Sequence, residues 1–294
     1  MNERLTCWIC AAPLDPAKQS GDAVNCIRCG PYAISASLRA SNFPLPDAER
    51  YRLSYWNRQR QLEGREPAIM TSYMLGALIP QLPDPPLQTK ADILLLSLSR
   101  EYPKAGERFQ LDVAKDYPLA CAKDPDELRY FQKCLFERGD LASEGNGVVI
   151  KGRGWERVAQ LATKAPASNT AFVAMKFNDE MLPLWESAFA PAIRRAEFEP
   201  RLANDPAHNE QIDAHIIAEL KQSRFVVADV TFSSPGVYFE AGYALGTGRQ
   251  VIWTCREDRE KTDMHFDTRQ YNHILWKSRD DLAEQLYYRI VATI

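Results

Sequence analysis

The segment that most constrains the fold of this chain is residues 225–246, which read FVVADVTFSSPGVYFEAGYALG. It opens with four apolar residues, a short run of the kind that buried parallel strands use, and Asp229 stands where such a strand ends. Ser233 and Ser234 supply hydroxyls that can cap a helix, and the proline after them suits the first helical position. The segment therefore predicts a buried strand, a tight polar loop and a helix over residues 237–245.

The predicted helix carries one carboxylate, Glu240, about one and a half turns from its start. A carboxylate drawn into a crevice is costly to bury unless it has a function, so Glu240 is the first candidate for chemistry. In open parallel sheets, ligands bind beyond the carboxyl ends of the strands, and Asp229 stands at such an end. The alternative is a strand-end cap for Asp229 and a solvated helix position for Glu240.

The whole stretch of residues 170–294 alternates strand and helix signals. Five strands that alternate with helices predict a parallel sheet covered by helices on both faces, which is the α/β class. Strands are predicted at residues 171–177, 199–202, 225–230, 250–255 and 273–276, and helices at 182–196, 212–222, 237–245 and 279–290. A linker over residues 163–169 precedes them.

The overall charge gives no argument for nucleic acid or an anionic membrane as a partner. The 294 residues include 36 Lys+Arg and 39 Asp+Glu, a formal net charge of −3,. No apolar run approaches the ~20 residues that cross a bilayer. The first ten residues, MNERLTCWIC, lack the apolar core of a signal peptide,. We therefore expect a cytoplasmic protein with no membrane partner.

Four of the seven cysteines form two Cys-x-x-Cys pairs near the start of the chain. Cys7 pairs with Cys10 and Cys26 with Cys29, and 15 residues separate the two pairs. Two such pairs can place four thiolates around one Zn²⁺, and a closed site of this kind has no open position for catalysis. We expect residues 1–32 to form a zinc ribbon with one structural Zn²⁺ in a reducing compartment. The alternative is four core cysteines.

The segment between the cysteines and the α/β part divides into two by composition. Residues 33–87 contain a helical stretch rich in arginine and aromatic residues and end in a Pro-rich linker, PQLPDPPL,. Residues 88–164 predict a second domain. Its elements are a helix at 91–99, an extended piece at 107–112, a helix at 124–138, a hairpin around Glu-Gly-Asn-Gly and a helix at 155–161. This order resembles the winged-helix family, and an α+β winged-helix-like domain is expected.

A winged helix suggests DNA as a partner, but the charge of residues 88–164 does not favour it. The segment carries 13 basic and 12 acidic residues, whereas DNA-binding domains usually present a basic face. Lys151, Arg153 and Arg157 lie at the expected wing, where they could contact phosphates. A protein-interaction role, a dimerisation role and a spacer are the alternatives.

Three motifs of the last segment resemble a known superfamily. They are FVAMKF at the first strand, ADVTFSSPGVYFEAGYALG at the third, and FDTRQYNHILW near the end. Together they look like the nucleoside 2-deoxyribosyltransferase superfamily and the bacterial TIR-like nucleotide-binding domains. The resemblance covers roughly residues 170–294. It implies a flavodoxin-like doubly wound sheet and cleavage or exchange of N-glycosidic bonds.

The resemblance also implies roles for individual residues. The acidic nucleophile of the superfamily lies on the helix after the third strand, which is Glu240 here. Members often read Asn-Pro-Asn-Val before that helix, whereas this chain has Gly236 in place of the second Asn and lacks its side chain. Asp229 would orient the sugar or protonate the leaving base. Substrate-binding candidates are Met175, Lys176, Asp213, Ser233, Ser234, Gly236, Tyr238, Arg269 and Asn272.

Physical reasons support part of this set. Free N–H groups at the start of the helix, from Gly236 to Tyr238, could hold a phosphate. Ala241 and Gly242 are expected to let the helix pack close to the sheet. A carboxylate near an anomeric carbon can stabilise the oxocarbenium-like state of glycosidic cleavage.

Three classes of function follow. The first is an N-glycosidic hydrolase or transferase that acts on a nucleoside, a nucleotide or NAD⁺; its combination with recognition modules resembles effectors of bacterial antiphage defence. The second is a nucleotide-sensing regulator whose front domains bind DNA or a protein. The third is a regulator whose pocket is vestigial. A homo-oligomer is expected, because related folds often complete their pockets across subunits.

Overall fold

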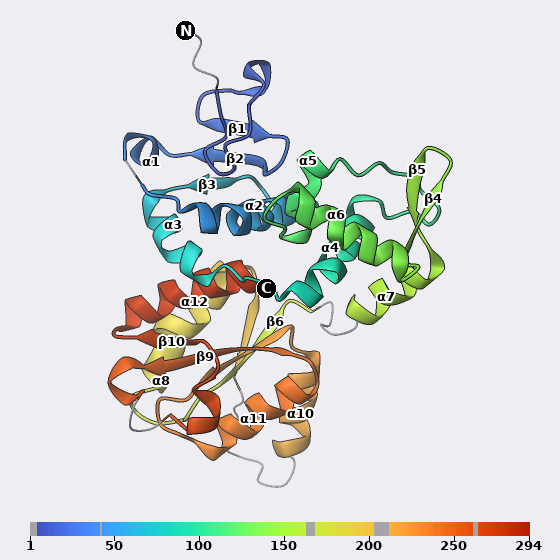
Figure 1. Cartoon of the computed structure of the whole chain (residues 1–294). Helices are drawn as coiled ribbons and strands as arrows, with labels where there is room; N and C mark the ends of the chain where they lie inside the picture. The colour runs from blue at the N-terminus through green and yellow to red at the C-terminus, as the bar shows by residue number, and fades with distance from the viewer. Residues whose placement is uncertain (1–4, 42, 163–167, 203–211, 261–263) are drawn as a thin grey trace. The chain divides into compact units, whose positions relative to one another are not determined.

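The computed structural model describes residues 5–41, 43–162, 168–202, 212–260 and 264–294 (Figure 1). The chain splits into two compact units, Met1–Leu161 and Ala162–Ile294. Each unit is described by itself. No helix in the described parts of the chain is long and apolar enough to cross a membrane.

The C-terminal unit is built on five parallel strands, as predicted. They are β6 (Thr170–Ala174), β7 (Glu199–Leu202), β8 (Phe225–Asp229), β9 (Gln250–Arg256) and β10 (His273–Trp276). Their order across the sheet is β10-β9-β8-β6-β7. The chain therefore adds β7 on one side of β6 and the later strands on the other. The order reverses between β6 and β8, which is the position where open α/β sheets bind ligands.

Helices cover both faces of this sheet (Figure 1). Alternate strand residues point to opposite faces, so Val173 and Phe225 belong to one core and Phe172 and Val226 to the other,. The first core is completed by α9 (Ala190–Arg195) and α12 (Arg279–Thr293), and the second by α10 (Ile212–Gln222) and α11 (Pro235–Gly246). The α/β class predicted for this unit is confirmed.

The helix predicted over residues 182–196 is interrupted. It consists of α8 (Leu182–Leu184), a π-helical turn (Trp185–Phe189) and α9. Pro191 has no N–H to bond the carbonyl four residues earlier, and the Ala190 N–H instead bonds the carbonyl of Trp185,. The proline therefore explains the wide turn.

The N-terminal unit begins with a three-stranded sheet against a long helix. Strands β1 (Ala23–Cys26) and β2 (Gly30–Ile34) are antiparallel, and β3 (Ala68–Met70) joins β2 in parallel. The helix is α2 (Asp47–Leu62). The sequence did not predict β3, because three residues are too few for a periodic signal. Short helices α1 (Ala36–Ala40) and α3 (Ser72–Leu78) flank these elements, with single 3-10 turns at Pro16–Lys18 and Ile79–Gln81.

The rest of this unit contains the three predicted helices and the predicted hairpin in order, with a short helix and a 3-10 turn between the first two helices that the sequence did not predict. The elements are α4 (Leu87–Glu101), α5 (Val113–Asp116), a 3-10 turn (Tyr117–Ala120), α6 (Pro125–Glu137), the hairpin β4 (Leu141–Glu144) and β5 (Gly147–Ile150), and α7 (Gly152–Ala162). Phe109, in the predicted extended piece, forms a bridge with Val148 of the hairpin. Leu94, Leu98 and Phe131 lie in the shared core.

The Pro-rich segment before α4 lies inside the N-terminal unit. Leu82 is buried, and its carbonyl accepts a hydrogen bond of 2.7 Å from Arg52 of α2. Arg58 of α2 forms an ion pair of 3.0 Å with Glu101 of α4. The cysteine module, α2 and the elements from α4 to α7 therefore contact one another within the unit Met1–Leu161.

Candidate functional site

The four cysteines of the two Cys-x-x-Cys pairs converge on one point. Their Sγ atoms all lie within 4.8 Å of one another. The Sγ atoms of Cys7 and Cys29 are 3.8 Å apart, and those of Cys10 and Cys26 are 3.6 Å apart. Four sulfurs at about 2.3 Å from a tetrahedral centre would lie about 3.8 Å from one another. The group could therefore hold a metal ion.

Polar side chains outside the group support the sulfurs. Ser54 Oγ lies 3.2 Å from Cys29 Sγ, and Tyr32 OH lies 3.0 Å from Cys7 Sγ. Asn57 Nδ2 donates to the Cys29 carbonyl at 2.7 Å. Ser54 and Asn57 stand three residues apart on one buried face of α2,. Two polar residues at this spacing inside an apolar face are the sequence signal by which this support could have been predicted.

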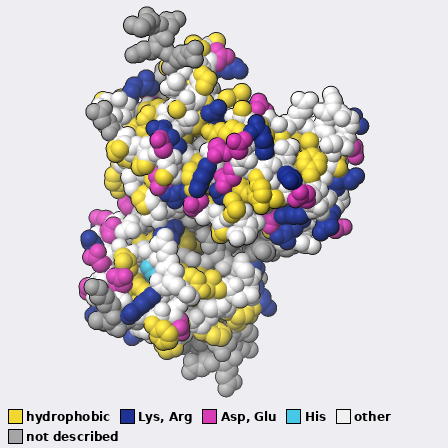
Figure 2. Space-filling model, viewed as in Figure 1, with side chains coloured by type: hydrophobic (Ala, Val, Ile, Leu, Met, Phe, Trp, Pro, Cys, Tyr) yellow, Lys and Arg dark blue, Asp and Glu magenta, His cyan; other side chains and the backbone are white. Residues whose placement is uncertain are grey.

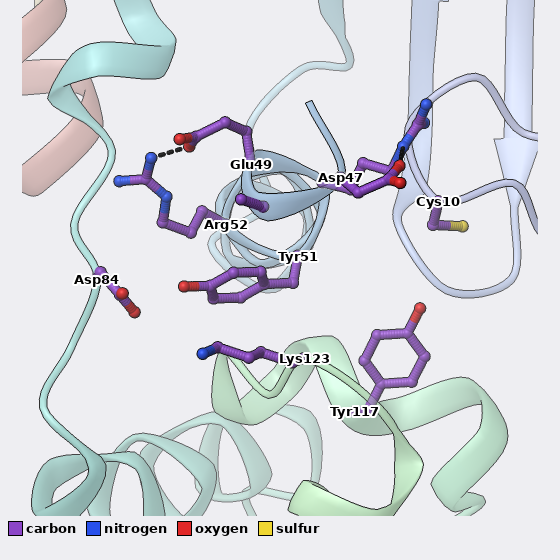
Figure 3. Close-up of a pocket in the computed structure, with 10 residues that line it drawn as sticks. Cys10, Asp47, Glu49, Tyr51, Arg52, Asp84, Tyr117 and Lys123 are labelled. Atoms are coloured by element: carbon purple, nitrogen blue, oxygen red, sulfur yellow. Dashed lines mark hydrogen bonds and ion pairs between the residues drawn. The ribbon is translucent and has the colours of Figure 1, made fainter. Parts of the chain in front are cut away.

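A cavity of about 600 Å³ lies beside the cysteine group (Figure 3). Tyr51 and Lys123 lie side by side in it, with Lys123 Nζ 5.7 Å from the ring centroid, and Asp84 faces the tyrosine hydroxyl. Arg50 donates to the carbonyls of Trp8 and Ile9, each at 2.9 Å. The arginine therefore braces the first cysteine pair against α2, which the sequence did not predict.

Asp229 lies at the end of β8 but is closed off from solvent, with 2% of its surface exposed. Its carboxylate accepts hydrogen bonds from Thr231 N at 3.0 Å, Thr254 Oγ1 at 2.7 Å and Trp276 Nε1 at 3.2 Å. Burial raises the pKa of Asp229, although these donors favour the ionised form,. The residue ties β8, β9 and β10 together.

Asp229 and Glu240 lie on opposite faces of the sheet. Alternate residues of a strand point to the same face, so Asp229 points to the same face as Phe225 and Val227. The core on that face contains Trp276 and residues of α12. Glu240 belongs to α11, which packs on the other face. This geometry contradicts the expectation that Asp229 orients a sugar or moves a proton beside Glu240.

Glu240 is a half-buried carboxylate. Burial raises its pKa to about 7. In the parts of the chain that the structure describes, it has no hydrogen-bond or ion-pair partner. Because helical residues are about 100° apart, Glu240 lies on the flank of α11 opposite Tyr238 and Leu245. Those two face β9 and the segment before β10, so Glu240 lies on the flank nearer α10, against which α11 packs.

The start of α11 differs in one respect from the prediction. Ser234 is the N-cap residue, but its side chain accepts no backbone hydrogen bond, and Ser233 has a φ of +46°. The first bond of the helix runs from Tyr238 N to Ser234 O at 3.2 Å. The N–H groups just before it, those of Gly236 and Val237, are therefore left without an intrahelical partner.

Three cations surround Phe232 in the loop after β8. Lys176 Nζ lies 5.6 Å from the ring centroid, and the guanidinium carbons of Arg256 and Arg259 lie 5.8 Å from it. Arg256 also pairs with Glu180 at 2.8 Å and with Asp258 at 2.7 Å. Lys176 was among the predicted binding residues. Arg256, the last residue of β9, and Arg259 were not, because they meet Phe232 only in the fold.

The other predicted binding residues are scattered. Met175 is 3% exposed and belongs to the core, which contradicts a role in binding. Asp213 lies in the first turn of α10, and its side chain falls outside the described residues. Arg269 and Asn272 line a small hollow of about 320 Å³. Of the two small residues expected to pack α11 on the sheet, Ala241 is buried there, whereas Gly242 is exposed.

A cavity of about 990 Å³ in the C-terminal unit lies between α11 and the segment before β10. Two of the predicted residues, Ser233 and Tyr238, line it, and Glu240 does not. The remaining lining residues are Pro235, Gly242, Leu245, Trp253, His265, Phe266, Asp267, Thr268, Gln270 and Tyr271.

Comparison of the chain with models of protein families, with curated proteins and with solved structures gave no match.

Proposed function

We propose that the C-terminal unit cleaves or exchanges an N-glycosidic bond of a nucleoside, a nucleotide or NAD⁺, with Glu240 as the acting carboxylate. The observation that carries the proposal is the state of Glu240, which is half buried, has a pKa raised to about 7, and lacks a partner among the described residues. A carboxylate near the anomeric carbon stabilises the oxocarbenium-like state or traps it as a covalent ester. With a pKa near 7, both the ionised and the protonated form are present at neutral pH.

The edge of the sheet can receive an anionic group. The N–H groups at the start of α11 are without intrahelical partners, and helix N-termini of this kind bind phosphate,. Lys176 adds a positive charge after β6. These features favour a phosphate-bearing substrate over a neutral nucleoside.

Fold-level arguments support the same proposal. Numbered within the unit, the strand order is 2-1-3-4-5, the order of flavodoxin-like doubly wound sheets,. The motifs around residues 172–177 and 229–246 resemble the nucleoside 2-deoxyribosyltransferase and TIR-like domains. Fold resemblance alone does not define an activity, so the proposal depends on Glu240.

The test is a product assay on the full chain. The protein is incubated with NAD⁺ and, separately, with deoxyribonucleosides and their monophosphates, and the release of nicotinamide or free base is measured. We expect release by the wild type and a loss of a hundredfold or more in Glu240→Gln. Glu186→Gln changes an exposed glutamate of the same unit and should keep full activity. Release of base by Glu240→Gln at the wild-type rate would refute the assignment.

The four cysteines hold one structural Zn²⁺ in this proposal, as a zinc ribbon. The sulfur separations of 3.6 and 3.8 Å fit tetrahedral thiolate coordination,. With all four positions taken, such an ion stabilises the fold and does no chemistry. Elemental analysis should find one zinc per chain.

For the elements from α4 to α7, a winged-helix-like fold with a protein partner is the proposal. Their basic residues are matched by acids: Arg138 and Arg157 both pair with Asp92, and Lys151 lies 3.9 Å from Glu144. Basic and acidic side chains are also interspersed on the face of this unit seen in Figure 2. Salt-dependent retention on DNA would contradict this and favour a DNA partner.

Nucleotide sensing is the second candidate function. The observation that favours it is the position of the cavity of about 990 Å³, which lies on the flank of α11 away from Glu240. A ligand held there would be bound without being cleaved. A homo-oligomer remains part of both proposals, and sedimentation of the full chain tests it.

A further inference from the structure

The cavity beside α11 has aromatic walls. Trp253 and Tyr271 stack with ring centroids 5.4 Å apart and an interplanar angle of 17°. Tyr238 also lines the cavity and meets the ring of His265 edge-on at 5.9 Å, and Phe266 lies 4.7 Å from that imidazole with 71% of its surface exposed. Five aromatic or imidazole rings therefore surround one hollow, where flat ligands can stack.

The walls are fixed relative to each other. The backbone N–H of His265 donates to Tyr238 OH at 2.9 Å, which ties the segment before β10 to α11. His265 Nδ1 also accepts from Asp267 N at 3.4 Å. A cavity held by such bonds is present before a ligand arrives, which lowers the entropy lost on binding.

Polar groups stand at the edges of this aromatic hollow. Asp267, Thr268 and Gln270 line it from the segment before β10. They offer both donors and acceptors, which the edge of a nucleobase requires. Ser233 and Pro235 also line the hollow, at the start of α11, where the N–H groups without intrahelical partners favour an anion,.

Gly242, which lines the cavity, is a further sign that the hollow receives a ligand. Gly242 lies in the middle of α11, where glycine costs about 1 kcal/mol relative to alanine. Its φ is not positive, and a Cβ built on it would meet no heavy atom within 4 Å. The backbone and the packing therefore do not require glycine at this position, whereas a side chain there would project into the hollow.

From these observations we infer that the cavity lined by Tyr238, Gly242, Trp253, His265 and Tyr271 binds the base of a nucleotide, with its phosphate toward the start of α11. The site is separate from Glu240 and is a binding site rather than a catalytic one. The inference deepens the sensing function and rests on it, and it does not require Glu240 to be catalytic.

Gly242→Leu of the full chain tests the inference. Leucine fills the hollow and is a better helix former than glycine, so the variant should fold at least as well as the wild type. Binding of AMP, GMP, CMP, UMP and NAD⁺ is measured by calorimetry. We expect the wild type to bind at least one of these probes and Gly242→Leu to bind it at least tenfold more weakly. Tyr271→Ala should weaken it roughly five- to a hundredfold, the range for loss of one base stack.

Two further variants separate this inference from the enzymatic proposal. Gly76→Leu makes the same change at a helical glycine of α3 with equally open surroundings, and should bind like the wild type. Glu240→Gln should also bind like the wild type, whatever it does to base release. Wild-type binding by Gly242→Leu, or no binding of any probe by the wild type, would overturn the inference. Loss of binding in Glu240→Gln alone would place the ligand on the other flank of α11 and overturn it too.

Discussion

The cysteine group of the N-terminal unit and Glu240 of the C-terminal unit are built in opposite ways. Each sulfur contacts another sulfur, and Ser54 and Tyr32 add hydrogen-bonding groups at 3.2 and 3.0 Å. Glu240 is half buried and has no partner among the described residues. Buried polar groups that are satisfied hold a fold together, whereas a partly buried group left unsatisfied costs stability. The first region is built like a structural site, and the second has the unsatisfied carboxylate on which the proposed chemistry depends.

Asp229 sharpens this comparison, because it belongs with the cysteines rather than with Glu240. The sequence places both carboxylates within one motif, 11 residues apart. In the fold, Asp229 accepts three hydrogen bonds beneath one face of the sheet, and Glu240 lies over the other face. Neighbouring acids in a motif can therefore have unrelated roles.

Removing one metal ligand should have the largest effect. Cys29→Ser is expected to abolish metal binding and unfold the N-terminal sheet, because metal binding contributes on the order of 10 kcal/mol in small zinc modules. Metal analysis and circular dichroism measure the two effects. Cys134→Ser, outside the group, is the matched control and should leave both unchanged. A folded N-terminal unit without metal would contradict the structural role.

Removing the Asp229 carboxylate should have the next largest effect. Asp229→Ala leaves the buried groups Thr254 Oγ1 and Trp276 Nε1 without their acceptor, and should lower the free energy of unfolding by about 3 kcal/mol. Denaturant unfolding is the measurement, with the exposed Asp179→Ala as control. An unchanged midpoint for Asp229→Ala would show that this carboxylate does not hold the strands.

Glu240→Gln should stabilise the protein, whereas Asp229→Ala destabilises it, and the gain should appear only at higher pH. The carboxyl has a folded pKa of about 7 and an ordinary value of 4.5. Its stabilising contribution is therefore complete below pH 4.5 and is lost as pH rises through 7. At pH 8 the variant should be more stable than the wild type by up to about 3 kcal/mol. Thermal unfolding at pH 5 and pH 8 measures the difference, and equal shifts at both values would contradict the raised pKa.

Ser54→Ala should have the smallest effect, about 1 kcal/mol, from the loss of one hydrogen bond to Cys29 Sγ,. Competition with a chelator measures the accompanying loss of metal affinity. The exposed Ser37→Ala provides the baseline. A metal affinity equal to that of the wild type would contradict a role of the Ser54 hydroxyl in supporting the cysteines. The contribution of α2 to this site would then be packing alone.

The sequence was sufficient for elements with strong local signals. The apolar runs of β6 and β8 and the capped helix α6, whose Asp124 side chain accepts from two backbone N–H groups, were predictable within a few residues. The strand β3 was not predictable, because its three residues pair with β2 only through the fold. The role of Asp229 depends on Thr254 and Trp276, which lie 25 and 47 residues further along the chain.

The candidate sites also divide into one that local sequence signals predict and others that depend on the fold. The spacing of the cysteines was enough to predict their convergence, because each pair lies within one tight turn. The aromatic cavity was not predictable, because its walls come from α11, β9 and the segment before β10. The position of Glu240 on the far flank of α11 also required the strand order, which decides what each side of the helix faces.

The most direct test of the central claim is the titration of the Glu240 carboxyl in the full chain. Carbon NMR of protein labelled at glutamate carboxyl groups follows each pKa, and the signal that disappears in Glu240→Gln identifies the residue. The account predicts a pKa of about 7 for Glu240. A value close to 4.5 would show a solvated carboxylate, and would contradict the chemical role assigned to this residue.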